Sequence, residues 1–157
     1  MNHLVIDIGG TAIKSALYMP SGQLADVRET ASDGREGAKA LLSRLHDLIE
    51  SYAAQGFGRI GVSTAGQVDC VAGRIIFAND NIPGYTGTPL AELLTRDWQV
   101  PVDVENDVNA AALGEAYFGS ARGTPDFLCL TYGTGIGGAI VINGQIYRGL
   151  SGLAGEF

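Results

Sequence analysis

The chain has 157 residues, of which 46% are hydrophobic, and this length is enough to bury one sizeable core. Ten Lys and Arg residues stand against 17 Asp and Glu residues, so the formal net charge is -7 at pH 7. This balance provides no broad basic field for a nucleic acid or an anionic membrane, and no apolar run approaches the roughly 20 residues that span a bilayer. A single globular domain that binds a small molecule is therefore the first expectation.

The start of the chain gives no sign of a secretory leader. Residues 1–3 lead directly into an apolar run, without a basic region or a cleavage site, so a cytoplasmic protein is expected. Cys70 and Cys129 are too few and too far apart for a disulfide framework or a paired-cysteine metal motif. We interpret both as core or partly buried residues.

The hydrophobic pattern predicts alternating strands and helices. Residues 4–8, 13–19 and 23–29 are typical of three strands in a β-meander. A helix is expected after Asp33, because apolar residues recur at helical spacing from Ala38 to Tyr52. The later predicted elements are a strand at 59–64, a hairpin at 68–77, a helix at 89–97, a strand at 102–105, a helix that Asp107 opens, and strands at 127–132 and 139–142. This mixture predicts an α/β fold.

A glycine-rich segment, Asp7-Ile8-Gly9-Gly10-Thr11, joins the first two predicted strands. Its glycines let backbone N–H groups approach an anion, and the hydroxyl of Thr11 adds a donor. A phosphate would repel Asp7 unless a cation bridged them, so Mg²⁺ is expected here with Asp7 as its ligand. The residues predicted to bind the phosphate together with its Mg²⁺ are Asp7, Gly9, Gly10, Thr11 and Lys14. The alternative is an ordinary glycine hairpin preceded by an acid.

A second glycine-rich segment, 131–138, holds four glycines and two threonines in eight residues between apolar strands. Close approach of the backbone to a ligand explains this glycine density better than strand stability does. The segment lacks the Gly-Lys-Ser/Thr of a Walker A loop, and the alternative is a plain bulged hairpin. Its predicted phosphate-binding residues are Thr131, Gly133, Thr134, Gly135, Gly137 and Gly138. Two such loops together favour a clamp on a polyphosphate.

A polar cluster between the two loops, 105–109, leaves a strand and enters an alanine-rich helix. Asp107 falls in the first helical turn, where the helix dipole stabilises a carboxylate that is able to accept a proton. Phosphoryl transfer needs an aligned hydroxyl, neutralised charge and a carboxylate that takes the proton. Asp107 is therefore the predicted catalytic base. The alternative is that Asn106 and Asp107 only cap the helix.

These three segments, in this order and spacing, resemble the ROK family of sugar kinases, within the hexokinase, acetate kinase and actin-like superfamily. The similarity extends to 63–69 and 152–157. It implies an actin-like ATPase (ribonuclease H-like) domain in which a mixed sheet is flanked by helices. It also implies an enzyme that uses ATP and Mg²⁺ to phosphorylate a hexose or N-acetylhexosamine, glucose or N-acetylmannosamine, at O6. The residues that would bind the sugar are Gly66, Asn106, Asp107 and Glu156.

The chain also departs from the family pattern. Relatives usually continue from Gly-Glu-Phe into Gly-His and a cysteine-rich zinc loop, whereas this chain ends at Phe157. The resemblance thus implies an N-terminal part that is inactive alone, with a second domain starting near 126–157. It places a structural Zn²⁺ and the rest of the sugar site in an absent C-terminal half, and implies a homodimer at full length. Ala65 and Tyr85 replace the usual proline and tryptophan, which leaves the sugar open.

Two other classes of function remain open. A sugar-responsive ROK transcriptional regulator would carry a winged helix-turn-helix before the first loop, and the six residues before Asp7 leave no room for one. Such a regulator could also lose the catalytic base, yet Asp107 is present. An actin-like ATPase or polymer is disfavoured by the sugar-type cluster at Asn106 and Asp107, and would turn over ATP without a sugar.

Overall fold

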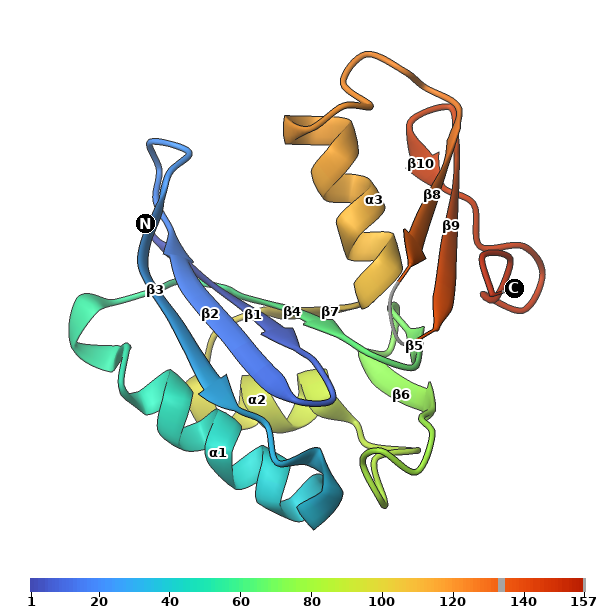
Figure 1. The fold of residues 1–157 in the computed structure, drawn as a ribbon. Helices are drawn as coiled ribbons and strands as arrows, with labels where there is room; N and C mark the ends of the chain where they lie inside the picture. The colour runs from blue at the N-terminus through green and yellow to red at the C-terminus, as the bar shows by residue number, and fades with distance from the viewer. Residues whose placement is uncertain (133–134, 157) are drawn as a thin grey trace. The chain divides into compact units, whose positions relative to one another are not determined.

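The computed structural model describes residues 1–132 and 135–156, and it contains strands, α-helices and short 3₁₀ helices (Figure 1). The chain divides into two compact units, Met1–Glu105 and Asn106–Phe157. No helix in the described part is long and apolar enough to cross a membrane.

The first unit is built on a five-stranded sheet in the order β3-β2-β1-β4-β7. Its strands are β1 (His3–Ile8), β2 (Ala12–Tyr18), β3 (Leu24–Ala31), β4 (Ile60–Thr64) and β7 (Val102–Asn106). The first three strands form the predicted antiparallel meander, whereas β4 runs parallel to β1. The sheet is therefore mixed, as the sequence predicts.

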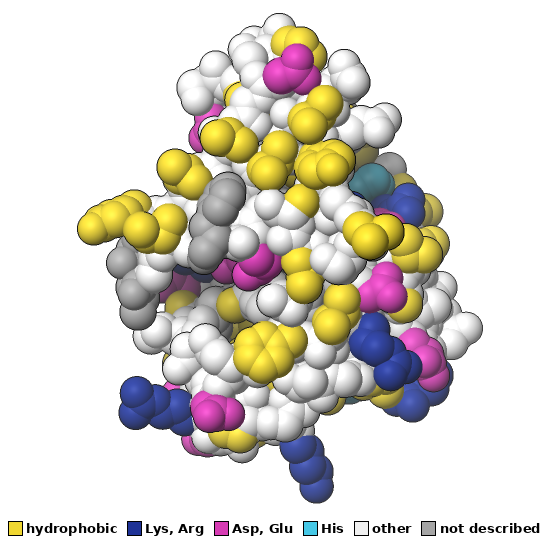
Figure 2. Space-filling view, turned by 90° about the vertical axis from the view of Figure 1, so that its right-hand side faces the viewer, with side chains coloured by type: hydrophobic (Ala, Val, Ile, Leu, Met, Phe, Trp, Pro, Cys, Tyr) yellow, Lys and Arg dark blue, Asp and Glu magenta, His cyan; other side chains and the backbone are white. Residues whose placement is uncertain are grey.

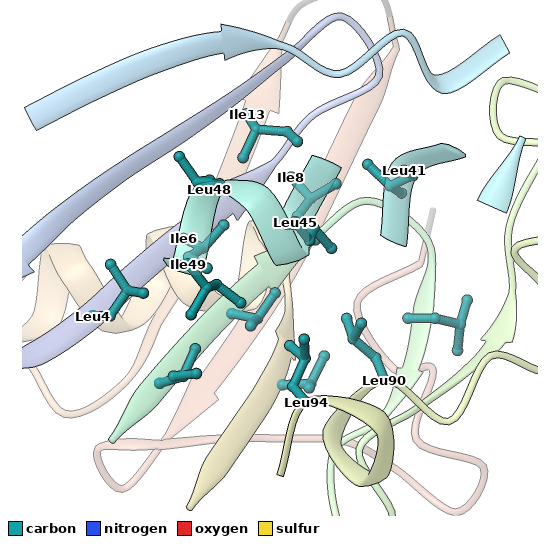
Figure 3. Close-up of a cluster of buried hydrophobic side chains, with 14 of the residues drawn as sticks. Leu4, Ile6, Ile8, Ile13, Leu41, Leu45, Leu48, Ile49, Leu90 and Leu94 are labelled. Carbon is teal, nitrogen blue, oxygen red and sulfur yellow. The ribbon is translucent and has the colours of Figure 1, made fainter. Parts of the chain in front are cut away.

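Two helices, α1 (Ala38–Glu50) and α2 (Leu90–Trp98), contribute to the core of this unit. Alternate residues of β1, namely Leu4, Ile6 and Ile8, are buried with leucines from both helices (Figure 3). Because neighbouring strand residues point to opposite faces, Asp7 is exposed on the other face of the sheet. The smaller elements of the unit are η1 (Gly34–Glu36), η2 (Ala53–Gln55), β5 (Gln67–Asp69) and β6 (Arg74–Phe77).

The second unit packs one helix against a three-stranded antiparallel sheet in the order β10-β9-β8. Its elements are α3 (Asp107–Phe118), β8 (Phe127–Tyr132), β9 (Ile136–Ile142) and β10 (Gln145–Ile146). Val108 and Ala112 of α3 are buried against Ala139 and Val141 of β9. The other face of this sheet exposes large apolar side chains. Figure 2 shows hydrophobic side chains, in yellow, at the surface of the protein. The exposed residues of β8 and β9 are Leu128, Leu130, Tyr132, Ile136 and Ile142.

The predicted start of the last strand pair is wrong by three residues. β9 begins at Ile136 rather than at 139, because Ile136, Gly137 and Gly138 pair with Tyr132, Thr131 and Leu130 of β8. Backbone pairing does not depend on a side chain, so the glycines join the ladder in spite of their low strand propensity. Gly137 and Gly138 are therefore strand residues.

Candidate active site

Asp7 lies at the end of β1 where the first glycine-rich loop begins. The hydroxyl of Ser63 on β4 donates a hydrogen bond of 2.8 Å to Oδ1 of Asp7. Lys14 of β2 occupies the register position opposite Asp7 and is exposed. A carboxylate, a hydroxyl and an ammonium group thus share the outer face of three neighbouring strands. The Ser63 contact was not predictable from the sequence, because it follows from the parallel pairing of β1 with β4.

The two glycines of the first loop have different surroundings. The N–H of Gly9 donates to the carbonyl of Ala12 at 2.9 Å, and a Cβ on Gly9 would lie 3.0 Å from that oxygen. A Cβ on Gly10 would meet no atom of the described residues within 4 Å. Gly9 therefore fits the tight turn, whereas Gly10 and the exposed Thr11 leave their backbone open to a ligand.

The segment that follows β4 is held by a buried polar pair. The hydroxyls of Thr64 and Tyr85 lie 3.1 Å apart, and both side chains are fully buried. Burial raises the pKa of Tyr85 to about 12, and the hydrogen bond with Thr64 opposes this rise. Gly66 has a φ of +101°, and a Cβ there would lie 2.7 Å from the carbonyl of Phe77. Glycine is thus required at 66 by both conformation and space.

Asn106 and Asp107 form the N-terminus of α3. Oδ1 of Asn106 accepts hydrogen bonds from the N–H groups of Val108 and Asn109, at 2.9 and 3.0 Å. Its Nδ2 donates to Oδ1 of Asp107 at 3.0 Å, and the Val108 N–H also donates to that oxygen at 2.9 Å. The predicted cap is confirmed for Asn106, and it orients the Asp107 carboxylate.

Gly137 of the second glycine-rich segment packs directly on this helix start. A Cβ on Gly137 would lie 2.6 Å from Cγ2 of Val108 and 2.7 Å from the hydroxyl of Thr131. Packing alone thus requires glycine at 137, and the role of Gly137 in phosphate binding stays a prediction. By contrast, Gly135 is exposed, and a Cβ on it would meet no atom of the described residues within 4 Å.

The end of the chain lies against the same strand. A Cβ on Gly155 would overlap the carbonyl of Gly138, so these two backbones are in close contact. Glu156, the next residue, is exposed, and its N–H donates to the Leu153 carbonyl at 3.1 Å. The second unit therefore brings together the helix start, Gly137 and Gly138 of β9, and the C-terminal segment. Two predicted residues of this loop, Gly133 and Thr134, lie outside the described part of the chain.

The described residues contain no cluster of three His, Cys, Asp or Glu side chains that could hold a metal ion. Mg²⁺ nevertheless suits the donors at the first loop, because it prefers oxygen ligands and usually completes its shell with water and phosphate oxygens. The Asp7 carboxylate is one such oxygen donor. The residues present therefore fit a phosphate-bound Mg²⁺ better than a cage made only of protein.

Comparison with known proteins defines the family. The mixed sheet with flanking helices is the actin-like ATPase fold found in ROK kinases. The model of the ROK family matches residues 3–157, and the chain belongs to this family.

A beta-glucoside kinase from Listeria monocytogenes is 37% identical over 157 residues, which are 100% of this chain and 52% of the relative. The structure of a ROK family glucokinase from Streptomyces griseus, in complex with glucose and AMPPNP, has a TM-score of 0.87 and 33% identity. The match covers 100% of this chain and 49% of the glucokinase chain. The chain thus spans about half the length of these relatives.

A more distant structure belongs to a ROK family transcriptional regulator, a homolog of the E. coli MLC protein. Its TM-score is 0.82 at 23% identity, and the match covers 99% of this chain and 40% of that chain. At this identity the likeness shows the shared fold alone.

Proposed function

We propose that the intact protein, at the length of its relatives, is an ATP-dependent sugar kinase. It transfers the γ-phosphoryl group of ATP to the O6 hydroxyl of a hexose or N-acetylhexosamine. The observation that carries this proposal is the Asp107 carboxylate at the start of α3, oriented by Asn106 and by the Val108 N–H. A beta-glucoside kinase and a glucokinase among the relatives support the same class of reaction.

In this proposal Asp107 is the catalytic base. As the sugar oxygen attacks the γ-phosphorus, the bond from that phosphorus to the ADP oxygen breaks, and Asp107 takes the hydroxyl proton. The side chains of Asn106 and Glu156 and the backbone of Gly66 bind other sugar hydroxyls, since amide and carboxylate groups pair with hydroxyls in a directional way. The hydrogen bonds that fix Asp107 reduce the reorientation needed for the proton transfer.

The two glycine-rich loops hold phosphates in this proposal. Gly10 and Gly135 support this role because each leaves open space beside its backbone, within the described part of the chain. Lys14 adds a positive charge to the same strand pair as Asp7. Asp7 would hold Mg²⁺ directly or through water, and the ion would neutralise phosphate charge when bound.

We also keep the prediction that a second domain starts near 126–157 and is completed by polypeptide beyond this chain. The exposed apolar face of β8 and β9 supports it, because contiguous apolar surface is normally covered in a folded protein. The matched relatives are about twice as long as this chain, which provides a source for that cover. On this view the chain alone is inactive.

The first experiment measures ADP release by the intact protein with Mg²⁺-ATP and single sugars. The panel contains glucose, N-acetylmannosamine, N-acetylglucosamine, mannose, fructose and a β-glucoside, and calorimetry measures the binding of each sugar in parallel. ADP release that depends on one sugar supports the kinase and identifies its substrate. Sugar binding without turnover favours a sensor or regulator, and ATP turnover without sugar favours an actin-like ATPase.

A further inference from the structure

A pocket of about 410 Å³ opens beside the first glycine-rich loop. Two segments line it: Gly10 and Thr11 of the loop, and residues 33–36 of the turn that follows β3. These lining residues are glycine, threonine and charged side chains. The charged side chains of this lining can bind a charged ligand group.

The turn at 33–36 is fixed firmly against the loop. The N–H of Ser32 donates to the carbonyl of Thr11 at 2.9 Å. Gly34 is buried, and a Cβ there would lie 3.0 Å from the Asn81 carbonyl and 3.3 Å from the Gly10 carbonyl. These contacts hold the turn beside the loop. The backbone of Arg35, the residue after Gly34, therefore has a defined position at the edge of the pocket.

The charges around this pocket are not equivalent. Nη2 of Arg44 pairs with Oδ2 of Asp33 at 2.9 Å and with Oε2 of Glu36 at 3.0 Å. Both acidic side chains of the pocket lining thus contact one guanidinium from α1, which balances one of their two negative charges. Arg35 lies between them in sequence, is exposed, and forms no ion pair within residues 1–132 and 135–156. The pocket therefore has one guanidinium available for an added anion.

We propose that Arg35 binds the terminal phosphate of a nucleoside triphosphate held by the first loop. This inference rests on the proposed kinase function and adds a residue that neither the motif nor the family resemblance assigned. A planar guanidinium with several N–H donors matches the oxygens of a phosphate and remains charged at any relevant pH. Charge on the transferred phosphoryl group is stabilised by such a donor during the reaction.

The test compares Arg35→Ala, Arg35→Lys and the control Lys39→Ala in the intact protein. Lys39 is an exposed cation in the first turn of α1 that does not line this pocket, so its removal matches the change in net charge. Calorimetry in the presence of Mg²⁺ measures the affinities for ATP, AMP and inorganic tripolyphosphate. Thermal unfolding checks that each variant is folded.

We expect Arg35→Ala to weaken ATP and tripolyphosphate binding by about tenfold or more, in line with a lost hydrogen bond to a charged group. AMP binding stays as in the wild type, Arg35→Lys gives an intermediate loss, and Lys39→Ala changes little. Unchanged ATP affinity in Arg35→Ala, or equal losses for ATP and AMP, would overturn the inference. A wild-type protein that binds no ATP would overturn it as well.

The inference and the proposed function can fail separately. If the wild type phosphorylates a sugar but Arg35→Ala binds ATP normally, the kinase proposal stands and the Arg35 assignment is wrong. If no sugar is phosphorylated but Arg35→Ala selectively loses ATP and tripolyphosphate, the anion site stands and the kinase proposal is wrong.

Discussion

Gly137 of β9 and Val108 of α3 are in such close contact that a Cβ on the glycine would lie 2.6 Å from Cγ2 of the valine. This contact holds the first turn of α3 against the strand that leaves the second glycine-rich loop. The cap residue Asn106 and the proposed base Asp107 belong to that turn. The glycine therefore positions the candidate catalytic carboxylate by letting the helix start approach the sheet.

Gly137→Ala should destabilise the protein. Because the new methyl group would overlap Val108 and Thr131, we expect a loss of about 1–3 kcal/mol in the free energy of unfolding, as for overpacked cores. Urea unfolding measures the loss. Gly135→Ala is the matched control, since no atom of the described residues lies within 4 Å of its added Cβ. Equal losses in both variants would show that the Val108 contact is not the cause.

Asp107→Asn should separate binding from catalysis in the intact protein. The asparagine has nearly the same shape and keeps an acceptor for the Val108 N–H, but it cannot take a proton at neutral pH. We expect sugar affinity close to that of the wild type and turnover lower by about 10²–10⁴, the range of general base catalysis. Steady-state ADP release and sugar calorimetry measure the two quantities.

The control for this substitution is Asp47→Asn, which removes an exposed carboxylate from α1 in the first unit. Its turnover should match that of the wild type. If Asp107→Asn loses sugar affinity and turnover by equal factors, Asp107 binds the sugar and the base assignment is wrong.

Gly135→Val should weaken nucleotide binding without unfolding the protein. The residue is exposed, so a larger side chain fits the fold but would occupy the space through which a phosphate approaches the backbone. We expect ATP affinity to fall by about tenfold or more, equivalent to about 1.4 kcal/mol. Sugar affinity and the unfolding midpoint should stay near wild-type values, and unaffected ATP affinity would remove the second loop from the nucleotide site.

Tyr85→Phe should change how stability depends on pH. The pKa of Tyr85 rises from 10.0 to about 12 on folding, so the native state binds more protons than the unfolded state between these values. The contribution of neutral Tyr85 to stability is therefore fully present below pH 10. It is lost as pH rises toward 12, by up to about 1.4 kcal/mol per pH unit. The phenylalanine variant lacks this contribution, and its stability should fall less steeply between pH 10 and 11.

Urea unfolding at pH 8, 10 and 11 compares the two proteins. At pH 8 the variant should be less stable by about 0.5–1.5 kcal/mol, because the buried Thr64 hydroxyl loses the Tyr85 hydroxyl as its partner. Parallel pH profiles for the two proteins would show that Tyr85 ionisation does not contribute to the slope.

The sequence predicted the kind of each main element, because strand alternation and helical spacing are properties of neighbouring residues. Leu4, Ile6 and Ile8 are buried while Asp7 between them is exposed, as the period of a strand requires. The cap at Asn106 was predictable for the same reason, since its partners lie two and three residues away. The start of β9 was not predictable from neighbouring residues, because its first glycines join the strand by pairing with β8.

Tertiary structure alone decided which distant residues meet. The hydrogen bond from Ser63 to Asp7 depends on the parallel pairing of β1 with β4, and the role of Gly137 depends on a helix side chain far away in sequence. Arg35 and Arg44 have the same side chain in the same acidic neighbourhood, yet only Arg44 pairs with Asp33 and Glu36 among the described residues. Local sequence encodes propensity and periodicity, whereas these contacts arise from the packing of separate segments, which excludes some side chains and brings others within hydrogen-bonding distance.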